Sequence, residues 1–238
     1  RKYNINFQNC NFIVKENRRL NDDTFLLVLH STELPPIQAG QFVNVKVEDS
    51  PSTFLRRPIS IHDVDKANGL LYLLVKIAGS GTAKLSTLTP GNKLNIVLPL
   101  GNSFTQPVQG RCLLVGGGVG IAPLLHLSKE LKKKKIEAVV LIGTRSKKDI
   151  VLEEEYQKYA PTYYTTEDGT YGEQGYPTQH SILKEHFDHI FCCGPLPMMK
   201  AIAQHAYTHH IDCEVSLENM MACGIGACLC CVEKTKDE

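Results

Sequence analysis

Cys112-Leu113-Leu114-Val115-Gly116-Gly117-Gly118-Val119-Gly120-Ile121-Ala122-Pro123 combines an apolar run, a glycine-rich turn and a proline, and this combination indicates the type of fold. Its first four residues form a short apolar run that is typical of a buried strand. Pro123 suits the first turn of a helix, where a missing N–H costs nothing. A glycine-rich turn between a strand and a helix lets a pyrophosphate approach backbone N–H groups. The G-x-G-x-x-G spacing is not met cleanly, so a tight turn without a ligand is the alternative.

Strands and helices alternate after this turn. We expect further strands at residues 138–142, 162–165, 190–193 and 213–217, with helices up to Lys135, around 178–185 and after Pro195. Alternation of this kind predicts a parallel, doubly wound sheet. The segment Cys193-Gly194-Pro195 also follows a strand, so it can face the same crevice as the glycine turn. Cys193 is a candidate neighbour of a bound nicotinamide, and core packing is its alternative role.

The sequence before the glycine turn has a different pattern of apolar and polar residues. Apolar or alternating runs at residues 25–30, 41–47 and 70–76 are separated by turn signals such as Asn68-Gly69 and Pro90-Gly91. Many short strands without helices between them predict an antiparallel β-barrel or sandwich. This pattern ends near Pro107.

Composition excludes several classes of function. The 238 residues are 42% hydrophobic and 21% charged, which is ordinary for a globular protein and excludes a disordered chain. The 26 Lys and Arg residues are balanced by 25 Asp and Glu residues, so we expect neither nucleic acid nor a membrane surface as partner. No apolar run approaches the length of a membrane span, and we expect no signal peptide. Nine cysteines without a signal peptide favour a reducing, cytoplasmic location.

Four of those cysteines lie close together near the end of the sequence. Cys223, Cys228 and Cys231 have the C-x4-C-x2-C spacing of plant-type [2Fe–2S] proteins. A four-cysteine zinc site and loop thiols without metal are the alternatives. No cysteine follows Cys231, so we expect the fourth ligand beyond Glu238. Cys213 and Cys230 are substitutes in principle, although adjacent Cys230 and Cys231 would ligate one cluster awkwardly.

Two further motifs complete a family resemblance. Arg57-Pro58-Ile59-Ser60 and Gly79-Ser80-Gly81-Thr82, together with the glycine turn and Cys-Gly-Pro, resemble the ferredoxin-reductase family. The resemblance implies a barrel that holds FAD and a second domain that holds the nicotinamide nucleotide. Arg57 offers a planar fork of donors for a phosphate, Ser60 a hydrogen bond to the flavin edge, and Gly81 and Thr82 backbone N–H groups for the pyrophosphate.

The implied binding residues form three sets. For FAD they are Arg57, Pro58, Ile59, Ser60, Leu74, Val75, Lys76, Gly81 and Thr82. For NAD they are Gly116, Gly117, Gly118, Gly120, Cys193, Gly194 and Pro195. For iron they are Cys223, Cys228 and Cys231. We expect residues 1–106 to form the FAD domain, 107–217 the NAD domain and 218–238 a small iron–sulfur segment.

The segment from Glu218 to Cys228 narrows the resemblance. It is similar to the family of electron-transfer subunits of bacterial two-subunit NAD-dependent dihydroorotate dehydrogenases, as are Leu55–Ser60 and Met198-Met199. The missing fourth cysteine and Cys230 depart from the pattern. The resemblance implies an FMN-containing catalytic partner subunit that oxidises dihydroorotate in pyrimidine biosynthesis, in a heterotetramer of two copies of each subunit. Electrons would pass from FMN through [2Fe–2S] and FAD to NAD+.

Two other functions are open at this point. The small subunit of an NADH-dependent ferredoxin:NADP reductase shares all of these parts, and a flavin-free zinc-binding interaction module belongs to a different class. The segment Gly143-Thr144-Arg145-Ser146-Lys147-Lys148 has the Arg and Ser residues common in NADP enzymes. NAD is therefore favoured by the resemblance alone.

Overall fold

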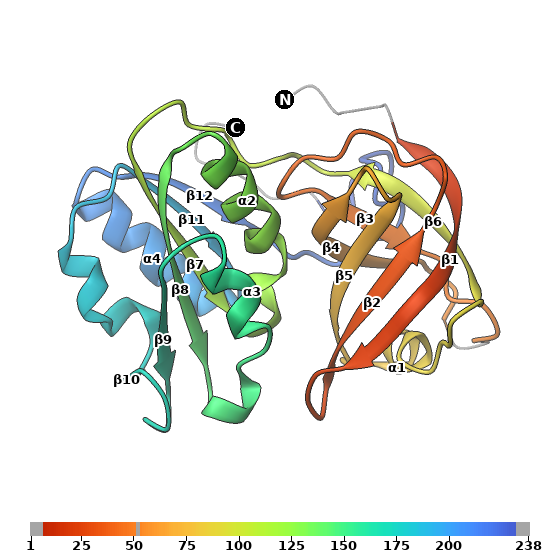
Figure 1. The fold of residues 1–238 in the computed structure, drawn as a ribbon, viewed down its shortest axis with the longest axis horizontal. Helices are drawn as coiled ribbons and strands as arrows, with labels where there is room; N and C mark the ends of the chain where they lie inside the picture. Colours follow the sequence, from red (N-terminus) through yellow and green to blue (C-terminus); the bar gives the residue numbers. More distant parts are fainter. Residues whose placement is uncertain (1–6, 51–52, 232–238) are drawn as a thin grey trace.

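The computed structural model describes residues 7–50 and 53–231. It contains a closed antiparallel β-barrel beside a six-stranded parallel sheet that carries helices (Figure 1). The fold class predicted from the sequence is confirmed: a barrel is followed by a doubly wound α/β unit.

Six strands close the barrel in the order β1-β2-β5-β4-β3-β6, and every neighbouring pair is antiparallel. They are β1 (Gln8–Arg19), β2 (Thr24–His30), β3 (Phe42–Val45), β4 (Arg57–Asp65), β5 (Leu70–Lys76) and β6 (Lys93–Leu100). The short helix α1 (Ser80–Leu85) follows β5. The three runs expected from sequence became β2, β3 and β5. The other three strands were not expected: β1 and β4 carry more polar residues, and β6 contains Pro99.

Alternation along β5 explains how the barrel meets the sheet unit. Leu71, Leu73 and Val75 point into the barrel core. Leu74, on the opposite face of the strand, packs in the hydrophobic cluster that the sheet and its helices form. One strand therefore serves two cores, because successive side chains point to opposite faces.

The parallel sheet has the strand order β10-β9-β8-β7-β11-β12. Its strands are β7 (Arg111–Gly117), β8 (Glu137–Thr144), β9 (Thr162–Thr166), β10 (Glu173–Gln174), β11 (His189–Cys193) and β12 (Asp212–Ser216). The helices are α2 (Ala122–Lys133), α3 (Glu153–Gln157) and α4 (Leu196–Thr208), with 3-10 turns η1 (Gly118–Ile121) and η2 (Lys147–Asp149). Over the described ranges, no helix combines the length and apolar character needed to cross a bilayer.

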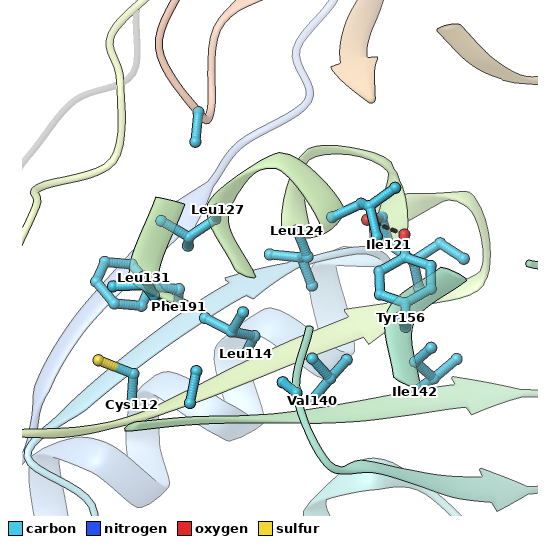
Figure 2. Packing of buried hydrophobic residues seen from close by; sticks show 14 of the residues in the cluster. Cys112, Leu114, Ile121, Leu124, Leu127, Leu131, Val140, Ile142, Tyr156 and Phe191 are labelled. Atoms are coloured by element: carbon cyan, nitrogen blue, oxygen red, sulfur yellow. Dashed lines mark hydrogen bonds between the residues drawn. The ribbon is translucent and has the colours of Figure 1, made fainter. Parts of the chain in front are cut away.

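The central strands are buried on both faces. On one face, Leu114 and Val140 pack with Leu124 of α2 and with Tyr156, whose hydroxyl donates to the Ile121 carbonyl oxygen at 2.7 Å (Figure 2). On the other face, Leu113, Val115, Val139 and Leu141 pack with Met199 and Ile202 of α4. The near-continuous apolar runs of β7 and β8 follow from this double burial.

The helix expected around residues 178–185 is absent from the described structure, and that expectation was wrong. Two 3-10 turns, η3 (Pro177–Gln179) and η4 (Ser181–Lys184), occupy the segment. His180 between them has an extended backbone, and its Nδ1 accepts a hydrogen bond from the Ile182 N–H at 2.9 Å. That contact ends one turn and caps the next, so no continuous helix forms.

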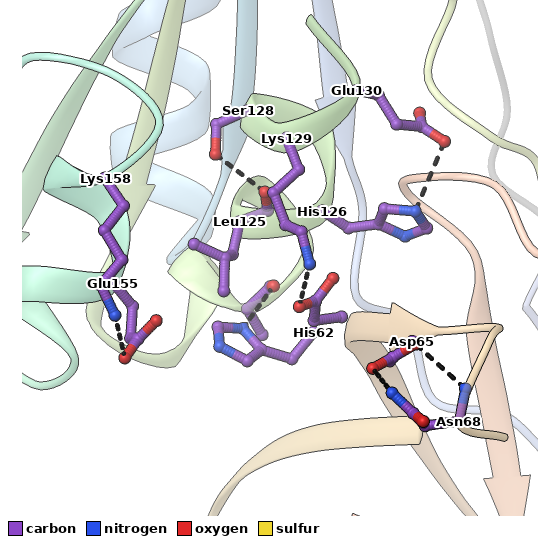
Figure 3. Close-up of polar contacts among 12 residues, drawn as sticks. His62, Asp65, Asn68, Leu125, His126, Ser128, Lys129, Glu130, Glu155 and Lys158 are labelled. Carbon is purple, nitrogen blue, oxygen red and sulfur yellow. Dashed lines mark hydrogen bonds and ion pairs between the residues drawn. The ribbon is translucent and has the colours of Figure 1, made fainter. Parts of the chain in front are cut away.

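Strand β4 and helix α2 join the two units. His62 donates from Nδ1 to the Ala122 carbonyl oxygen at 2.9 Å (Figure 3). Beside it, Lys129 Nζ and Asp63 Oδ2 lie 2.5 Å apart. Full burial lowers the pKa of His62 to about 4, so the ring is neutral at neutral pH. These contacts fix the barrel against the first helix after the glycine turn.

Candidate functional site

A cavity of about 570 Å³ lies between the carboxyl edge of the parallel sheet and the barrel. Four of the predicted site residues line it: Lys76, Gly117, Gly118 and Pro195. Other lining residues come from the β1–β2 turn, the end of β8 and the start of α4, including Asp23, Arg145, Asp149, Glu167, Tyr176 and Met198. Its position at the ends of parallel strands is the usual ligand site of an open α/β sheet.

The four predicted glycines of the turn have different surroundings. Gly118 has a φ of +54°, and a Cβ built on it meets nothing within 4 Å. A Cβ on Gly117 would lie 2.7 Å from Met198 Sδ. A Cβ on Gly116 would lie 2.6 Å from Cγ2 of Ile121, and one on Gly120 would lie 2.4 Å from the Cys193 carbonyl oxygen. Gly118 therefore borders open space, whereas Gly116 and Gly120 allow segments of the chain to pack closely.

Cys193 and Gly194 lie behind the cavity wall. Cys193 is 1% exposed at the end of β11, and burial, with a contribution from the charge of Glu218, raises the pKa of its thiol to about 12. The thiol is therefore protonated at neutral pH. Gly194 has a φ of +153°, and a Cβ there would lie 2.7 Å from the Met198 methyl carbon. Both residues hold the strand end against the glycine turn.

A second cavity, of about 580 Å³, is formed where the barrel meets the sheet unit. Seven predicted residues line it: Pro58, Ile59, Ser60, Leu74, Val75, Lys76 and Thr82. Lys76 and Val119 line both cavities, so the two cavities adjoin at these side chains. A planar group in the second cavity can thus meet a group in the first.

Arg57 and Gly81 make a close contact at the side of the second cavity. A Cβ on Gly81 would lie 2.7 Å from Arg57 Nε, so only glycine lets the guanidinium lie over the start of α1. Thr82 Oγ1 accepts hydrogen bonds from the N–H groups of Ala78 and Gly79 at 2.9 and 3.2 Å. A guanidinium over a tight turn, next to an apolar strand-lined cavity, fits a flavin nucleotide with its pyrophosphate.

Sequence reasoning missed a large part of this lining. The segment Ser216–Met221 forms one wall of the second cavity, whereas the sequence pattern predicts only the end of a strand at residues 213–217 and, from Glu218 on, a family resemblance. Burial raises the pKa of the Glu218 carboxyl on this wall. The β1–β2 turn at Asn21, Asp23 and Thr24 lines the first cavity and carries no sequence motif. Its Asn21 side chain accepts from the N–H groups of Asp23 and Thr24, which is a turn signal without functional content.

The cysteine loop is shaped by backbone N–H groups. The N–H of Cys228 donates to Cys223 Sγ at 3.4 Å, and this contact, followed by that of the Ile225 N–H, lowers the pKa of the Cys223 thiol to about 6. Gly224 and Gly226 have φ values of +70° and +82°, which glycine adopts without strain. Donors that stabilise a thiolate fit a cluster ligand.

Other contacts of the cysteine loop hold it against neighbouring backbone and against the barrel. Cys230 Sγ donates to the Met220 carbonyl oxygen at 3.7 Å. The carbonyl oxygen of Cys223 accepts from Asn44 Nδ2 at 3.3 Å, which ties the loop to β3 of the barrel. Within residues 7–50 and 53–231, no three His, Cys, Asp or Glu side chains converge on a metal position. The loop thus supplies suitable thiols and N–H donors, but its sulfurs are not drawn together.

Comparisons with known proteins agree with this geometry. The family model of the oxidoreductase NAD-binding domain matches residues 114–204, which include the glycine turn and Cys193. Three relatives carry the name dihydroorotate dehydrogenase B (NAD(+)), electron transfer subunit. That of Fusobacterium nucleatum subsp. nucleatum is 36% identical over 94% of this chain and 88% of its own length. The relative from Streptococcus pneumoniae is 40% identical over 90% of this chain and 84% of its own length. The relative from Bacillus velezensis is 42% identical over 88% of this chain and 80% of its own length.

Solved structures show the same architecture. An NADH-dependent reduced ferredoxin-NADP oxidoreductase, studied for flavin-based electron bifurcation, superposes with a TM-score of 0.84 at 29% identity over 92% of this chain and 80% of its own. A cytochrome P450 reductase from Amycolatopsis superposes with a TM-score of 0.75 at 22% identity, covering 88% and 70%, and shows the fold alone. The ferredoxin-NADP oxidoreductase is thus related in fold, whereas the relatives matched over nearly the whole chain agree on one subunit type. The chain belongs to the family of electron transfer subunits of dihydroorotate dehydrogenase B (NAD(+)).

Proposed function

We propose that this chain passes electrons from a dihydroorotate-oxidising partner subunit to NAD+, with FAD in the barrel-side cavity and NAD in the sheet-side cavity. The observation that carries the proposal is that the two cavities adjoin at Lys76 and Val119. Hydride transfer needs the two reacting rings in contact, and adjoining cavities allow that contact.

The proposed FAD residues divide by role. Arg57, Gly81 and Thr82 bind the phosphates, while Pro58, Ile59, Ser60, Leu74, Val75 and Lys76 line the ring cavity. The Arg57 guanidinium offers a charged pair of N–H donors, which a neutral side chain does not. Bound FAD would supply the exchange between a two-electron hydride carrier and single-electron carriers.

The proposed NAD residues divide in the same way. Gly117, Gly118 and Pro195 line the nucleotide cavity, and Gly118 leaves room for a pyrophosphate to approach the backbone. Gly116, Gly120, Cys193 and Gly194 hold the turn and the strand end in place by close packing. The neutral Cys193 thiol adds no charge behind the reacting rings.

The cysteine loop is the proposed point at which electrons from the partner subunit enter this chain. Cys223, Cys228 and Cys231 would ligate a [2Fe–2S] cluster together with a fourth thiolate, which supplies one-electron transfer when bound. The exposed apolar side chains of Met220, at 88% exposure, and Leu229, at 66%, lie on the same loop. Exposed apolar groups around a redox site suit burial against a partner protein.

The assembly and location are further parts of the proposal. The partner would be the FMN-containing catalytic subunit, in a heterotetramer of two copies of each chain. Residues 1–106, 107–217 and 218–238 would be the FAD, NAD and iron–sulfur units; residues 1–6, 51–52 and 232–238 lie outside the described structure. All nine cysteines are free thiols, as a reducing cytoplasm would keep them.

The test is co-expression of the full chain with a dihydroorotate dehydrogenase catalytic subunit. We expect a co-purifying complex with flavin absorbance, iron without zinc, a paramagnetic signal after reduction, and reduction of NAD+ by dihydroorotate. Reduction of ferredoxin and NADP+ without any dihydroorotate activity would favour the ferredoxin:NADP reductase instead. Zinc in a colourless protein would favour the interaction module and overturn the proposal.

A further inference from the structure

Two pairs of oppositely charged side chains and one further carboxylate line the nucleotide cavity. Lys76 Nζ lies 3.1 Å from Asp23 Oδ2, and Arg145 Nη2 lies 4.0 Å from Asp149 Oδ1. Glu167 also lines the cavity. Two cations therefore face three carboxylates among the lining residues, and the cavity carries a net negative charge.

The position of Arg145 after β8 affects which dinucleotide the cavity prefers. It follows β8, the second strand of the parallel sheet along the chain. In doubly wound folds, residues after the second strand meet the adenosine ribose, where an acidic residue favours a free 2′-hydroxyl and an arginine a 2′-phosphate. Arg145 alone would therefore favour the phosphorylated dinucleotide.

The Asp149 carboxylate is fixed close to this arginine. Its Oδ2 accepts hydrogen bonds from the Ser146 N–H at 3.1 Å and from Ser146 Oγ at 2.9 Å, and its Oδ1 is the atom nearest Arg145. The carboxylate is 23% exposed, whereas the Arg145 side chain is 70% exposed. Asp149 is thus a held negative charge, and Arg145 is a long side chain that it can attract.

The positions of Asp23, Lys147 and Lys148 are consistent with the net negative charge of the cavity. Burial raises the pKa of the Asp23 carboxyl, but hydrogen bonds from Thr24 and Lys76 outweigh this effect and lower it. The charge of Arg145 adds to the lowering, so it also reaches across the cavity. Lys147 Nζ lies over the Tyr171 ring at 5.2 Å. Lys147 and Lys148 are not among the residues lining the described cavity. A 2′-phosphate would add negative charge where Arg145 already faces carboxylates.

We propose that Asp149 is a specificity-determining residue, which neutralises Arg145 and makes the cavity select a dinucleotide without a 2′-phosphate. The inference rests on the proposed function, because it requires that this cavity binds a nicotinamide dinucleotide. A phosphate carries about −1.5 to −2 charge and needs an available cation. Removing the Asp149 charge releases Arg145 for that role.

Asp149→Asn is the direct test, because asparagine still accepts from Ser146 but carries no charge. The full chain with its partner subunit is titrated calorimetrically with 5′-AMP and with 2′,5′-ADP, which differ by the 2′-phosphate. We expect the variant to bind 2′,5′-ADP on the order of tenfold more tightly, with 5′-AMP affinity within about twofold of wild type. The gain should shrink at high salt, because the sites are partly exposed. The kcat/KM ratio of NADPH to NADH should rise in parallel.

Three controls separate the outcomes. Arg145→Gln in the Asp149→Asn background should abolish the gain, and Arg145→Gln alone should leave 2′,5′-ADP affinity unchanged. Glu48→Gln removes a carboxylate from the exposed Lys46–Glu48 pair of the barrel and should change neither affinity. Equal 2′,5′-ADP affinities of wild type and Asp149→Asn, with 5′-AMP binding intact, would overturn the inference alone. Failure of all proteins to bind 5′-AMP and to accept electrons from NADH would instead overturn the proposed function.

Discussion

The glycine turn and the cysteine loop are both glycine-rich segments at proposed redox sites, but they are built in different ways. The glycine turn is packed against the end of β11: a Cβ on Gly120 would lie 2.4 Å from the Cys193 carbonyl oxygen. The cysteine loop is open, with Cys228 and Cys230 exposed and with Asn44 providing a hydrogen bond from the barrel. Surrounding strands and helices therefore shape the turn, whereas local N–H donors shape the loop.

The two sites therefore obtain their shapes from different sources. Close packing against a core fixes a site before any ligand arrives. A loop with little core of its own gains its final geometry from the metal and from the partner surface, so ligand binding and ordering are coupled. Changes in the turn should therefore alter stability, and changes in the loop should alter electron transfer alone.

The largest effect is expected at Gly120. Gly120→Val places a branched side chain against the backbone of Cys193 and Gly194, which cannot move without separating β7 from β11. We expect a loss of more than about 4 kcal/mol in the free energy of unfolding, measured by urea denaturation, and loss of NADH oxidation.

Gly118→Val is the matched variant for Gly120→Val. Its Cβ meets open space, so the cost is the left-handed backbone, about 1–2 kcal/mol. It should keep FAD bound but block the approach of the nucleotide. Equal stability losses in both variants would show that the turn is not shaped by packing.

The next effect concerns the loop, where function should fail without a stability change. Cys228→Ala removes an exposed thiol, so the unfolding free energy and NADH-to-dye reduction should remain near wild type. Electron exchange with the partner subunit should be lost, together with iron and the paramagnetic signal. Cys230→Ala, which loses a 3.7 Å contact to the Met220 carbonyl oxygen, should change none of these. Full electron exchange with the partner subunit in Cys228→Ala would show that Cys228 does not ligate the cluster.

Substitution of Arg57 tests whether the barrel-side cavity depends on its ligand for folding, as we expect of the loop, or keeps its fold without the ligand. Arg57→Ala removes the guanidinium over Gly81 and should weaken FAD binding by ~2–3 kcal/mol, which is roughly 30- to 150-fold in Kd. The barrel has its own core, so the variant without FAD should stay folded by circular dichroism. Arg57→Lys keeps the charge without the planar fork and should bind FAD with intermediate affinity. Stoichiometric yellow protein in Arg57→Ala would remove Arg57 from the site.

The smallest effect is a pH dependence at the seam between barrel and sheet. The folded pKa of His62, about 4, lies below the usual value of 6.5, because burial disfavours the charged ring. The unfolded chain therefore binds more protons between these values. The stabilising effect is complete above about pH 6.5 and is lost as the pH falls toward 4.

The difference between wild type and a His62→Gln variant isolates this group. Glutamine can still donate to the Ala122 carbonyl oxygen but does not titrate. Urea denaturation at pH 7 and pH 5 should show wild type losing about 2 kcal/mol more than the variant. Parallel losses in the two proteins would mean that His62 is not held neutral at the seam.

Features that depend on local patterns could be predicted from the amino-acid sequence. Residues 112–123 predicted the strand, turn and helix start that the structure contains, because apolar runs, glycines and proline act over a few residues. The alternation of strands and helices predicted the parallel sheet in the same way. The family of redox subunits followed from short motifs whose residues are neighbours in the chain.

Features that join distant segments could be found only in the folded chain, because no local pattern shows which segments meet. The wall at Ser216–Met221, the β1–β2 turn over the nucleotide cavity and the contact of Gly120 with Cys193 each bring together residues far apart in sequence. The Arg145–Asp149 pair is local in sequence, but its geometry depends on the turn η2, in which Ser146 and Asp149 cap each other. The prediction of a helix at residues 178–185 was wrong for a local reason. His180 Nδ1 accepts from the Ile182 N–H, and this hydrogen bond competes with a continuous helix without changing the pattern of apolar residues in the sequence.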